Sequence, residues 1–190
     1  MSERRATFKV DLRGGQDRLR QMILYVAARS RDAMRFGRIK LNKILWKSDF
    51  DAFAARGIPV TGCAYQRLRL GPAPKAMLPL YTEMLRTGLL REEVTDFGDE
   101  VEERRPIALV DPNMSYFNDE DLSFVEAAVS YYWHLTGMET SDDSHGLAWS
   151  TRSDGEPMPY QSALLSDRRP GPKQMQRLRD RIREQGLQSE

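Results

Sequence analysis

The sequence holds few of the residues from which disulfides and metal centres are built. Among its 190 residues there is one cysteine, Cys63, and there are two histidines, His134 and His145. A single cysteine excludes a disulfide within the chain and fits a reducing compartment. These three side chains show no paired metal-ligand spacing, so we predict no metal site, and no other cofactor is indicated.

Long apolar runs and an excess of one charge are also lacking. The longest apolar run covers residues 22–28, whereas a membrane-spanning helix needs about 18–20 such residues. The N-terminus is polar and no apolar signal core follows it, so we expect a cytoplasmic protein without a membrane partner. The formal net charge of +1 offers no field that attracts nucleic acid to the chain as a whole, so such a partner is not favoured.

The motifs of several common enzyme classes do not occur. There is no Walker A loop, no Gly-x-Gly-x-x-Gly phosphate loop and no Gly-x-Ser-x-Gly nucleophile turn. With 40% apolar and 30% charged residues, the composition is that of a globular chain, and its length suits one domain. We therefore expect a globular chain without these catalytic motifs, and predict no enzyme activity.

Apolar periodicity predicts three helices and a strand in the first half of the chain. Helical spacing indicates amphipathic helices over residues 16–35 and 39–56, and the second has the wider apolar face, which makes it the central helix. Alternation favours a short strand over residues 65–70. Gly71–Pro74 then breaks the strand, and a helix is expected over residues 74–87.

The second half predicts an acidic hairpin followed by shorter helices. Residues 89–111 read as a β-hairpin arm in which acidic side chains outnumber arginines. Asn118 is the expected N-cap of a helix that ends at Gly137. A further helix is expected from Ser141 through Trp149, and a strand or turn over residues 160–165.

Together these elements predict an α+β fold that is mostly helical, with a compact helical core and a small antiparallel β-hairpin or sheet. We expect residues 1–15 to form a flexible N-terminal arm and residues 16–165 to form the domain. Residues 166–190 are expected to form a linker and a basic C-terminal helix. This tail is either a solvated extension or a partner-binding segment, and its candidate contact residues are Arg168, Arg169, Arg177 and Arg181.

Three segments, in this order and spacing, carry a resemblance to a known family. The first is Lys40-Leu41-Asn42-Lys43-Ile44-Leu45-Trp46-Lys47-Ser48-Asp49-Phe50 with the loop Gly57-Ile58-Pro59-Val60-Thr61-Gly62. The second is Tyr65 with Leu70-Gly71-Pro72-Ala73-Pro74, and the third is Ser144-His145 with Trp149. They resemble the motifs of Panacea domains, the SocA-like antitoxin family, except that Trp46 stands where the family more often has tyrosine.

The resemblance implies an antitoxin that binds and neutralises a cognate protein toxin, encoded beside the toxin gene. Some family members are thought also to deliver the toxin to a cellular protease. The family-motif positions that the resemblance marks as structural or partner-binding are Lys40, Leu41, Lys43, Trp46, Asp49, Tyr65, Gly71, Pro72, Pro74, His145 and Trp149. The sequence does not indicate an oligomeric state.

Each conspicuous motif residue has a structural and a functional interpretation. Asp49 lies near the apolar face of its helix, so it either caps the backbone around Thr61-Gly62 or contacts a partner. The turn at Gly71–Pro74 is expected to be mainly architectural. His145 and Trp149 stand four residues apart, so they share a helix face either as core residues or as a shallow site.

Two rival functions remain open at this stage. One is a nucleic-acid-associated regulator that uses the basic tail, which predicts binding that weakens steeply with salt. The other is a hydrolase that pairs His145 with Asp49 or Asp143, although no nucleophile is evident.

Overall fold

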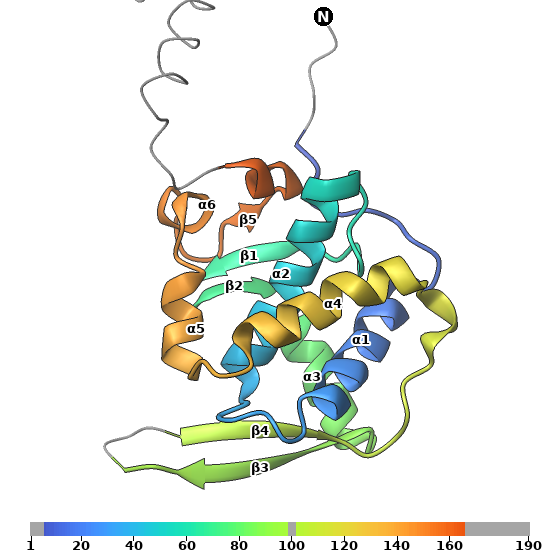
Figure 1. Cartoon of the computed structure of the whole chain (residues 1–190), viewed down its shortest axis with the longest axis vertical. Helices are drawn as coiled ribbons and strands as arrows, with labels where there is room; N and C mark the ends of the chain where they lie inside the picture. The colour runs from blue at the N-terminus through green and yellow to red at the C-terminus, as the bar shows by residue number, and fades with distance from the viewer. Residues whose placement is uncertain (1–5, 99–101, 166–190) are drawn as a thin grey trace, which may run out of the picture.

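The computed structural model describes residues 6–98 and 102–165 (Figure 1). Within these residues the chain forms six α-helices, two short 3-10 helices and two small antiparallel sheets. The predicted fold class, α+β and mostly helical, is therefore confirmed. The tail arginines Arg168, Arg169, Arg177 and Arg181 lie outside the described residues, as does the expected linker.

Three helices supply most of the main hydrophobic core. α2 (Arg38–Arg56) lies at the centre, with α1 (Gly15–Arg29) and α4 (Asp119–Tyr132) packed against it (Figure 1). Leu41, Ile44 and Leu45 of α2 are completely buried in this core. Burial on several sides of one helix confirms that the residue 39–56 segment is the central one.

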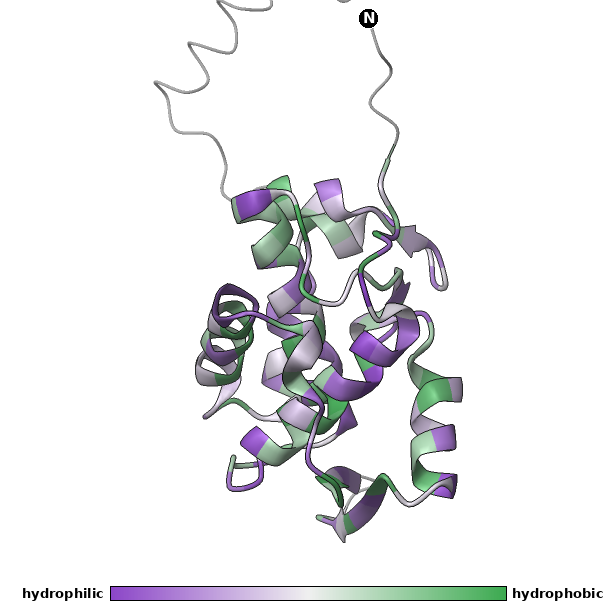
Figure 2. Cartoon of the chain, turned by 90° about the vertical axis from the view of Figure 1, so that its right-hand side faces the viewer, coloured by the Kyte–Doolittle hydropathy of each residue, from purple (hydrophilic) through white to green (hydrophobic). Residues whose placement is uncertain are grey.

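α3 (Met77–Arg86) presents one apolar face to this core. It buries Leu80, Tyr81 and Met84, while Leu78 on its other side is exposed. Figure 2 shows hydrophobic and hydrophilic residues alternating along the helices, as expected for helices with one face inward. No helix in the described part of the chain combines the length and apolarity that crossing a membrane requires.

A three-stranded sheet, in the order β2-β1-β5, lies beside α2. It contains β1 (Tyr65–Leu68), β2 (Gly71–Pro74) and β5 (Pro157–Met158), all antiparallel to their neighbours. The prediction that Gly71–Pro74 only breaks the strand is wrong, because these residues form β2. A strand with prolines fits here because β2 is an edge strand, where a missing backbone N–H leaves no central ladder unpaired.

Two predicted helix boundaries are also wrong. α3 begins at Met77, because Pro74 is still paired with Tyr65 in the sheet. α1 ends at Arg29, six residues before the expected end. The carbonyls that follow α1 are satisfied by side chains, since Arg105 donates to the backbone oxygens of Arg31 and Ala33.

A β-hairpin extends from the base of the helical core, as the sequence predicted. β3 (Leu90–Asp96) pairs antiparallel with β4 (Glu102–Ala108) (Figure 1). We call the described residues 90–98 and 102–110 the arm. α1 and α2 both contact β4, so one side of the arm is attached to the core.

The C-terminal third departs most from the predicted elements. Asn118 caps α4 in a capping box with Asp121, as expected. Gly137, however, opens α5 (Gly137–Asp143) instead of ending α4, because Thr136 caps the new helix. The expected helix through Trp149 is interrupted after α5, and α6 covers only Leu147–Ser150.

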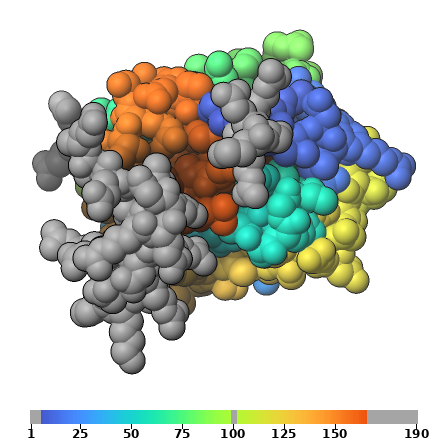
Figure 3. Space-filling model, turned by 90° about the horizontal axis from the view of Figure 1, so that it is seen from above, coloured from blue at the N-terminus to red at the C-terminus, as the bar shows by residue number. Residues whose placement is uncertain are grey.

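The two ends of the described chain meet above α2. The short 3-10 helix η2 (Tyr160–Leu164) replaces the expected strand or turn, and another, η1 (Met114–Tyr116), precedes α4. The Tyr160 N–H donates to the Thr7 carbonyl at 2.7 Å. Seen from above, the last described residues (orange to red), the end of α2 (teal) and the N-terminal segment (blue) lie next to one another (Figure 3).

Gly71, at the start of β2, gives the first testable prediction. Its φ of 94° is left-handed, and a Cβ there would lie 2.7 Å from Lys43 Cε and would also collide with Ser144 Oγ. Gly71→Ala should therefore lower the free energy of unfolding by about 2–5 kcal/mol through strain and overpacking. Chemical denaturation measures this loss.

Gly88→Ala is the matched control for this variant. Gly88 also has a positive φ, 72°, but nothing lies within 4 Å of its would-be Cβ. Its substitution should cost only about 1–2 kcal/mol, the price of the backbone conformation. Equal losses for the two variants would contradict the close packing at Gly71.

Candidate functional site

α2 places three charged side chains in the protein interior. Lys40, Lys43 and Asp49 are 1%, 2% and 0% exposed, respectively. Each bonds to backbone or hydroxyl groups of a neighbouring segment, as a buried charge must find polar partners. All three belong to the family-motif positions that the sequence singled out.

Asp49 holds the loop after α2 and the first strand. One carboxylate oxygen accepts the Thr61 backbone N–H at 2.5 Å, and the other accepts the hydroxyls of Thr61 and, at 2.9 Å, Tyr65. Burial raises the pKa of this carboxyl, while the Thr61 and Tyr65 hydrogen bonds act in the opposite direction. The geometry is that of a loop cap, the structural interpretation of Asp49.

An aromatic cluster closes the space around Asp49. The rings of Phe50 and Tyr65 meet edge to face at 5.3 Å, and the Phe50 and Tyr160 centroids lie 5.1 Å apart. Tyr160 donates its hydroxyl to the Cys63 carbonyl at 2.6 Å. Trp46 extends the cluster, with its ring 5.7 Å from Phe50. Water is thereby kept from the carboxylate, which strengthens its hydrogen bonds.

Lys43 holds the turn end of the hairpin formed by β1 and β2, and Asp49 holds its open end. Its ammonium donates to the Pro72 carbonyl at 3.0 Å, close to Gly71. Burial lowers the pKa of the Lys43 amine to about 7. The amine is thus close to half-charged near neutral pH, unlike an exposed lysine.

His145 and Trp149 lie together although no helix carries both. Their rings stack with centroids 3.8 Å apart, and the Trp149 indole N–H donates to the Leu68 carbonyl at 2.8 Å. The Arg67 guanidinium lies 4.2 Å from the centre of the Trp149 ring. Burial, followed by the neighbouring Lys43, lowers the pKa of His145. Through the Trp149 hydrogen bond, the pair attaches α6 to the turn end of the β1–β2 hairpin.

The other motif positions complete the scaffold. The Lys40 ammonium donates to the Met34 carbonyl at 2.6 Å and, more weakly, to the Trp133 carbonyl at 3.4 Å. Burial lowers the pKa of Lys40 to about 8, although Glu103 counteracts this shift. Leu41 is a core residue, and Pro74 pairs with Tyr65 in the sheet.

The structure does not assemble the acid–histidine pair of the hydrolase hypothesis. Asp49 bonds within its own cluster, and Asp143 accepts the hydroxyls of Tyr131 and Tyr132 at 2.8 and 2.9 Å. His145 lies instead 3.4 Å from the Ser141 hydroxyl. That hydroxyl is buried and donates to the Leu70 carbonyl, so its proton is already committed to the hairpin. Among residues 6–98 and 102–165 there is no cluster of three or more metal-ligating side chains.

Sequence reasoning missed three residues that complete these contacts. Ser141 stands four residues before His145, a spacing that already suggested a shared helix turn. Thr61 was named only as part of a loop, although its hydroxyl is a second donor to Asp49. Tyr160 lies 111 residues from Asp49 in the chain, and no local pattern could have indicated their contact.

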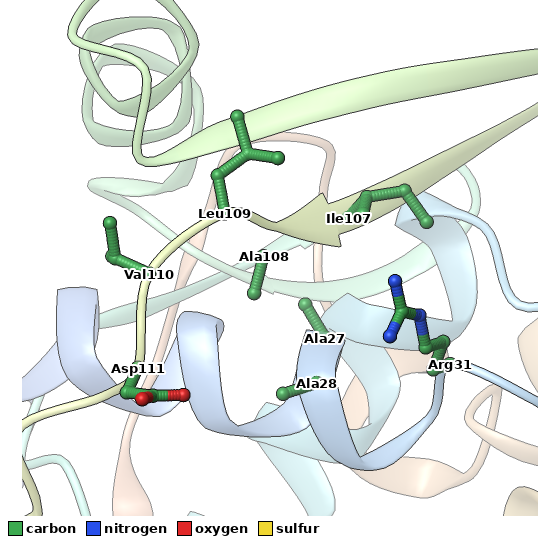
Figure 4. A pocket seen from close by; sticks show the side chains of 8 residues that line it. All are labelled: Ala27, Ala28, Arg31, Ile107, Ala108, Leu109, Val110 and Asp111. Atoms are coloured by element: carbon green, nitrogen blue, oxygen red, sulfur yellow. The ribbon is translucent and has the colours of Figure 1, made fainter.

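Two hollows open on the surface near these elements. The first, which we call the Lys43 cavity, has a volume of about 470 Å³ and is bounded by α2, the β1–β2 hairpin and α3. The second, the arm-base hollow, has a volume of about 320 Å³ and lies between α1 and the end of β4. Figure 4 shows Ala27 and Ala28 of α1 facing this hollow, with Arg31 and Asp111 at opposite ends.

The Asp49 cluster predicts a measurable energetic coupling. Asp49→Ala leaves the Thr61 N–H and the Tyr65 hydroxyl without their acceptor, which should cost about 3 kcal/mol of unfolding free energy. In a double-mutant cycle with Tyr65→Phe, the two losses should fall short of additivity by about 1 kcal/mol or more. Additive losses in denaturant titrations would show that the two side chains do not interact.

The buried Lys43 amine predicts a pH-dependent stability. Because its folded pKa of about 7 lies below the usual 10.5, the unfolded chain binds more protons between these values. The stability contributed by Lys43 should therefore rise as pH increases from about 7 to 10. Lys43→Met should remove this rise in unfolding titrations.

Lys47→Met is the control for this titration. Lys47 forms an i,i+4 ion pair with Asp51 at 2.8 Å on the more exposed side of α2. Its removal should leave the slope of stability against pH between 7 and 10 intact. A Lys43→Met protein with the same slope as the unchanged chain would refute the assignment.

Comparisons with known proteins agree with the sequence motifs. The family model described as "Antitoxin SocA-like, Panacea domain" matches residues 41–150, from the first turns of α2 to the end of α6. No curated protein and no solved structure matches the chain. The matched region contains the Asp49 loop cap, the Lys43 contact and the His145–Trp149 stack. The chain belongs to the SocA-like antitoxin family with a Panacea domain.

Proposed function

We propose that this protein neutralises a cognate protein toxin by binding it directly, without catalysing a reaction. The observation that supports this proposal most is the family match over residues 41–150. The match covers most of α2, the β1–β2 hairpin and the arm. Delivery of the bound toxin to a cellular protease, which the resemblance implies for some members of the family, is a further part of the proposal. Neither step requires a catalytic group.

The buried motif residues leave toxin contact to other side chains. Lys43, Asp49 and Tyr65 are each at most 2% exposed, so they hold the hairpin and cannot form an interface. Exposed apolar side chains gather instead at the base of the arm, where Leu109 and Val110 are 50% and 41% exposed. They line the arm-base hollow, whose volume of about 320 Å³ leaves room for an inserted side chain from a partner.

The arm also supplies charge for recognition. Its described part carries the acids Glu92, Glu93, Asp96, Glu102 and Glu103. Several of them pair with arginines of the arm itself, so the arm carries charges of both signs along its strands. Acidic side chains at a rim speed association with a basic toxin surface more than they deepen affinity. A stable complex would bury about 1,600 Å² in total.

Co-expression with the neighbouring toxin gene tests this proposal. Growth should be restored by the unchanged chain, and toxin and antitoxin should co-purify. Leu109→Asp places a charge at the centre of the proposed interface and should weaken toxin binding at least tenfold, which corresponds to about 1.4 kcal/mol.

Met138→Asp is the matched control. Met138 is 57% exposed on α5 and does not line the arm-base hollow, so a charge there should leave rescue and binding intact. A chain that neither restores growth nor binds the toxin would refute the antitoxin function. Rescue that is unaffected by Leu109→Asp would refute only the choice of surface.

A further inference from the structure

The Lys43 cavity combines an apolar floor with a buried amine. Its apolar lining comes from α2, the hairpin and α3, and includes Ile39, Leu68, Leu70 and Met77. Its volume of about 470 Å³ lies within the range of about 300–1,000 Å³ that small-molecule sites occupy. Lys43 lines this cavity although its side chain is almost fully buried.

The charges around the cavity are unbalanced. Lys43, Arg69 and Lys75 form no ion pair with any residue of the described chain, while Arg38 pairs with Glu92 at 3.4 Å. The one acidic residue of the lining, Asp154, is already paired with Arg67 at 2.9 Å. A bound anion would therefore meet positive charge that the protein itself does not neutralise.

The polar groups at the bottom of the cavity are incompletely satisfied. An ammonium has three donors, and the Pro72 carbonyl accepts only one from Lys43. Asn42, which also lines the cavity, has an enclosed side-chain oxygen without a hydrogen-bond partner. Rotating this amide would turn its NH₂ group to the same place, so it too can donate to an anion. Each of these groups lacks a partner that a polar atom of a ligand would supply.

We propose that the Lys43 cavity binds a small organic carboxylate. The carboxylate accepts hydrogen bonds from Lys43 and Asn42, and the apolar body of the ligand covers Leu68, Leu70 and Met77. One buried ammonium matches the single charge of a carboxylate, and Arg69 and Lys75 at the rim attract it. A peptide strand is a poorer occupant, because Pro72 and Pro74 of edge strand β2 offer no N–H to pair with.

Calorimetric titration of the full-length protein with octanoate tests this site. Octanoate should bind at one site, and octanamide, which has the same chain without the charge, should bind at least tenfold more weakly. Lys43→Met should weaken octanoate binding at least tenfold and remain folded, since it removes a buried charge without a counter-charge. Lys47→Met, on the more exposed side of α2, should bind as the unchanged chain does.

The pH dependence supplies a second readout. The titratable and charged groups around Lys43 are His145, Arg38, Arg69, Lys75 and Asp154. Octanoate affinity should fall severalfold between pH 6.5 and pH 8.5 as Lys43 loses its proton, and the fall should shrink in Lys43→Met. Arg69→Gln with Lys75→Gln, both exposed on the rim, should weaken binding severalfold without affecting the fold.

Three results would overturn the proposal. Octanoate that does not bind saturably, or that binds Lys43→Met as tightly as the unchanged chain, would remove the site. Octanamide that binds as well as octanoate would show that charge plays no part. Octyl phosphate that binds more tightly than octanoate would overturn the choice of a carboxylate. None of these titrations involves the toxin, so their outcome is independent of the antitoxin function.

Discussion

The fold depends on the contact between α2 and the β1–β2 hairpin, which buried charges on α2 hold at both ends. Lys43 binds the Pro72 carbonyl at one end, and Asp49 binds Tyr65 at the other. Neither bond is an ion pair, since each charge bonds to backbone or hydroxyl groups. Such bonds are directional, so they fix how the hairpin lies on the helix, which apolar packing alone does not do.

The two charges cannot neutralise each other through the core. Lys43 and Asp49 are six positions apart in α2, which corresponds to about 9 Å along the helix axis and about 120° around it. Asp49 is surrounded by donors from the Thr61 loop and two tyrosines. Lys43 has one carbonyl and, on its open side, a cavity with more positive charge at the rim. The acidic end of the contact is therefore complete within the protein, whereas the basic end is not.

The sequence predicted the parts of the fold that depend on local pattern. The central helix, the acidic hairpin and the Asn118 cap follow from periodicity, charge and capping chemistry, which act within a few residues. The end of α1 and the strand at Gly71–Pro74 depend on distant partners, Arg105 for one and β1 for the other. Tertiary contacts there overrode the local preference of the chain.

The candidate site shows the same division between local and distant information. The motif residues were identified from their order along the chain, but the partners of Lys43, Asp49 and Trp149 lie more than ten residues away. His145 and Trp149 are an instructive case, because they meet as predicted while the shared helix does not exist. Ser144 turns the chain between α5 and α6, and stacking brings the rings together. The spacing of four residues thus correctly predicted that the two rings lie close together, but the reason given, a shared helix, is wrong.

The Lys43 and Asp49 contacts share no residue with the lining of the arm-base hollow, the surface proposed above for toxin contact. The β1–β2 hairpin and the two α2 residues that bind it, Lys43 and Asp49, lie within the matched residues 41–150, and Lys43 and Asp49 are buried. The arm-base hollow is different, because Ala27, Ala28 and Arg31 on its α1 side precede the match, while its β4 side lies within it. Substitutions at exposed Ala28 or Leu109 change the shape of the hollow without touching Lys43 or Asp49. The buried charges of α2 and the exposed side chains of the proposed contact surface are therefore different residues, so that surface can vary while Lys43 and Asp49 stay unchanged.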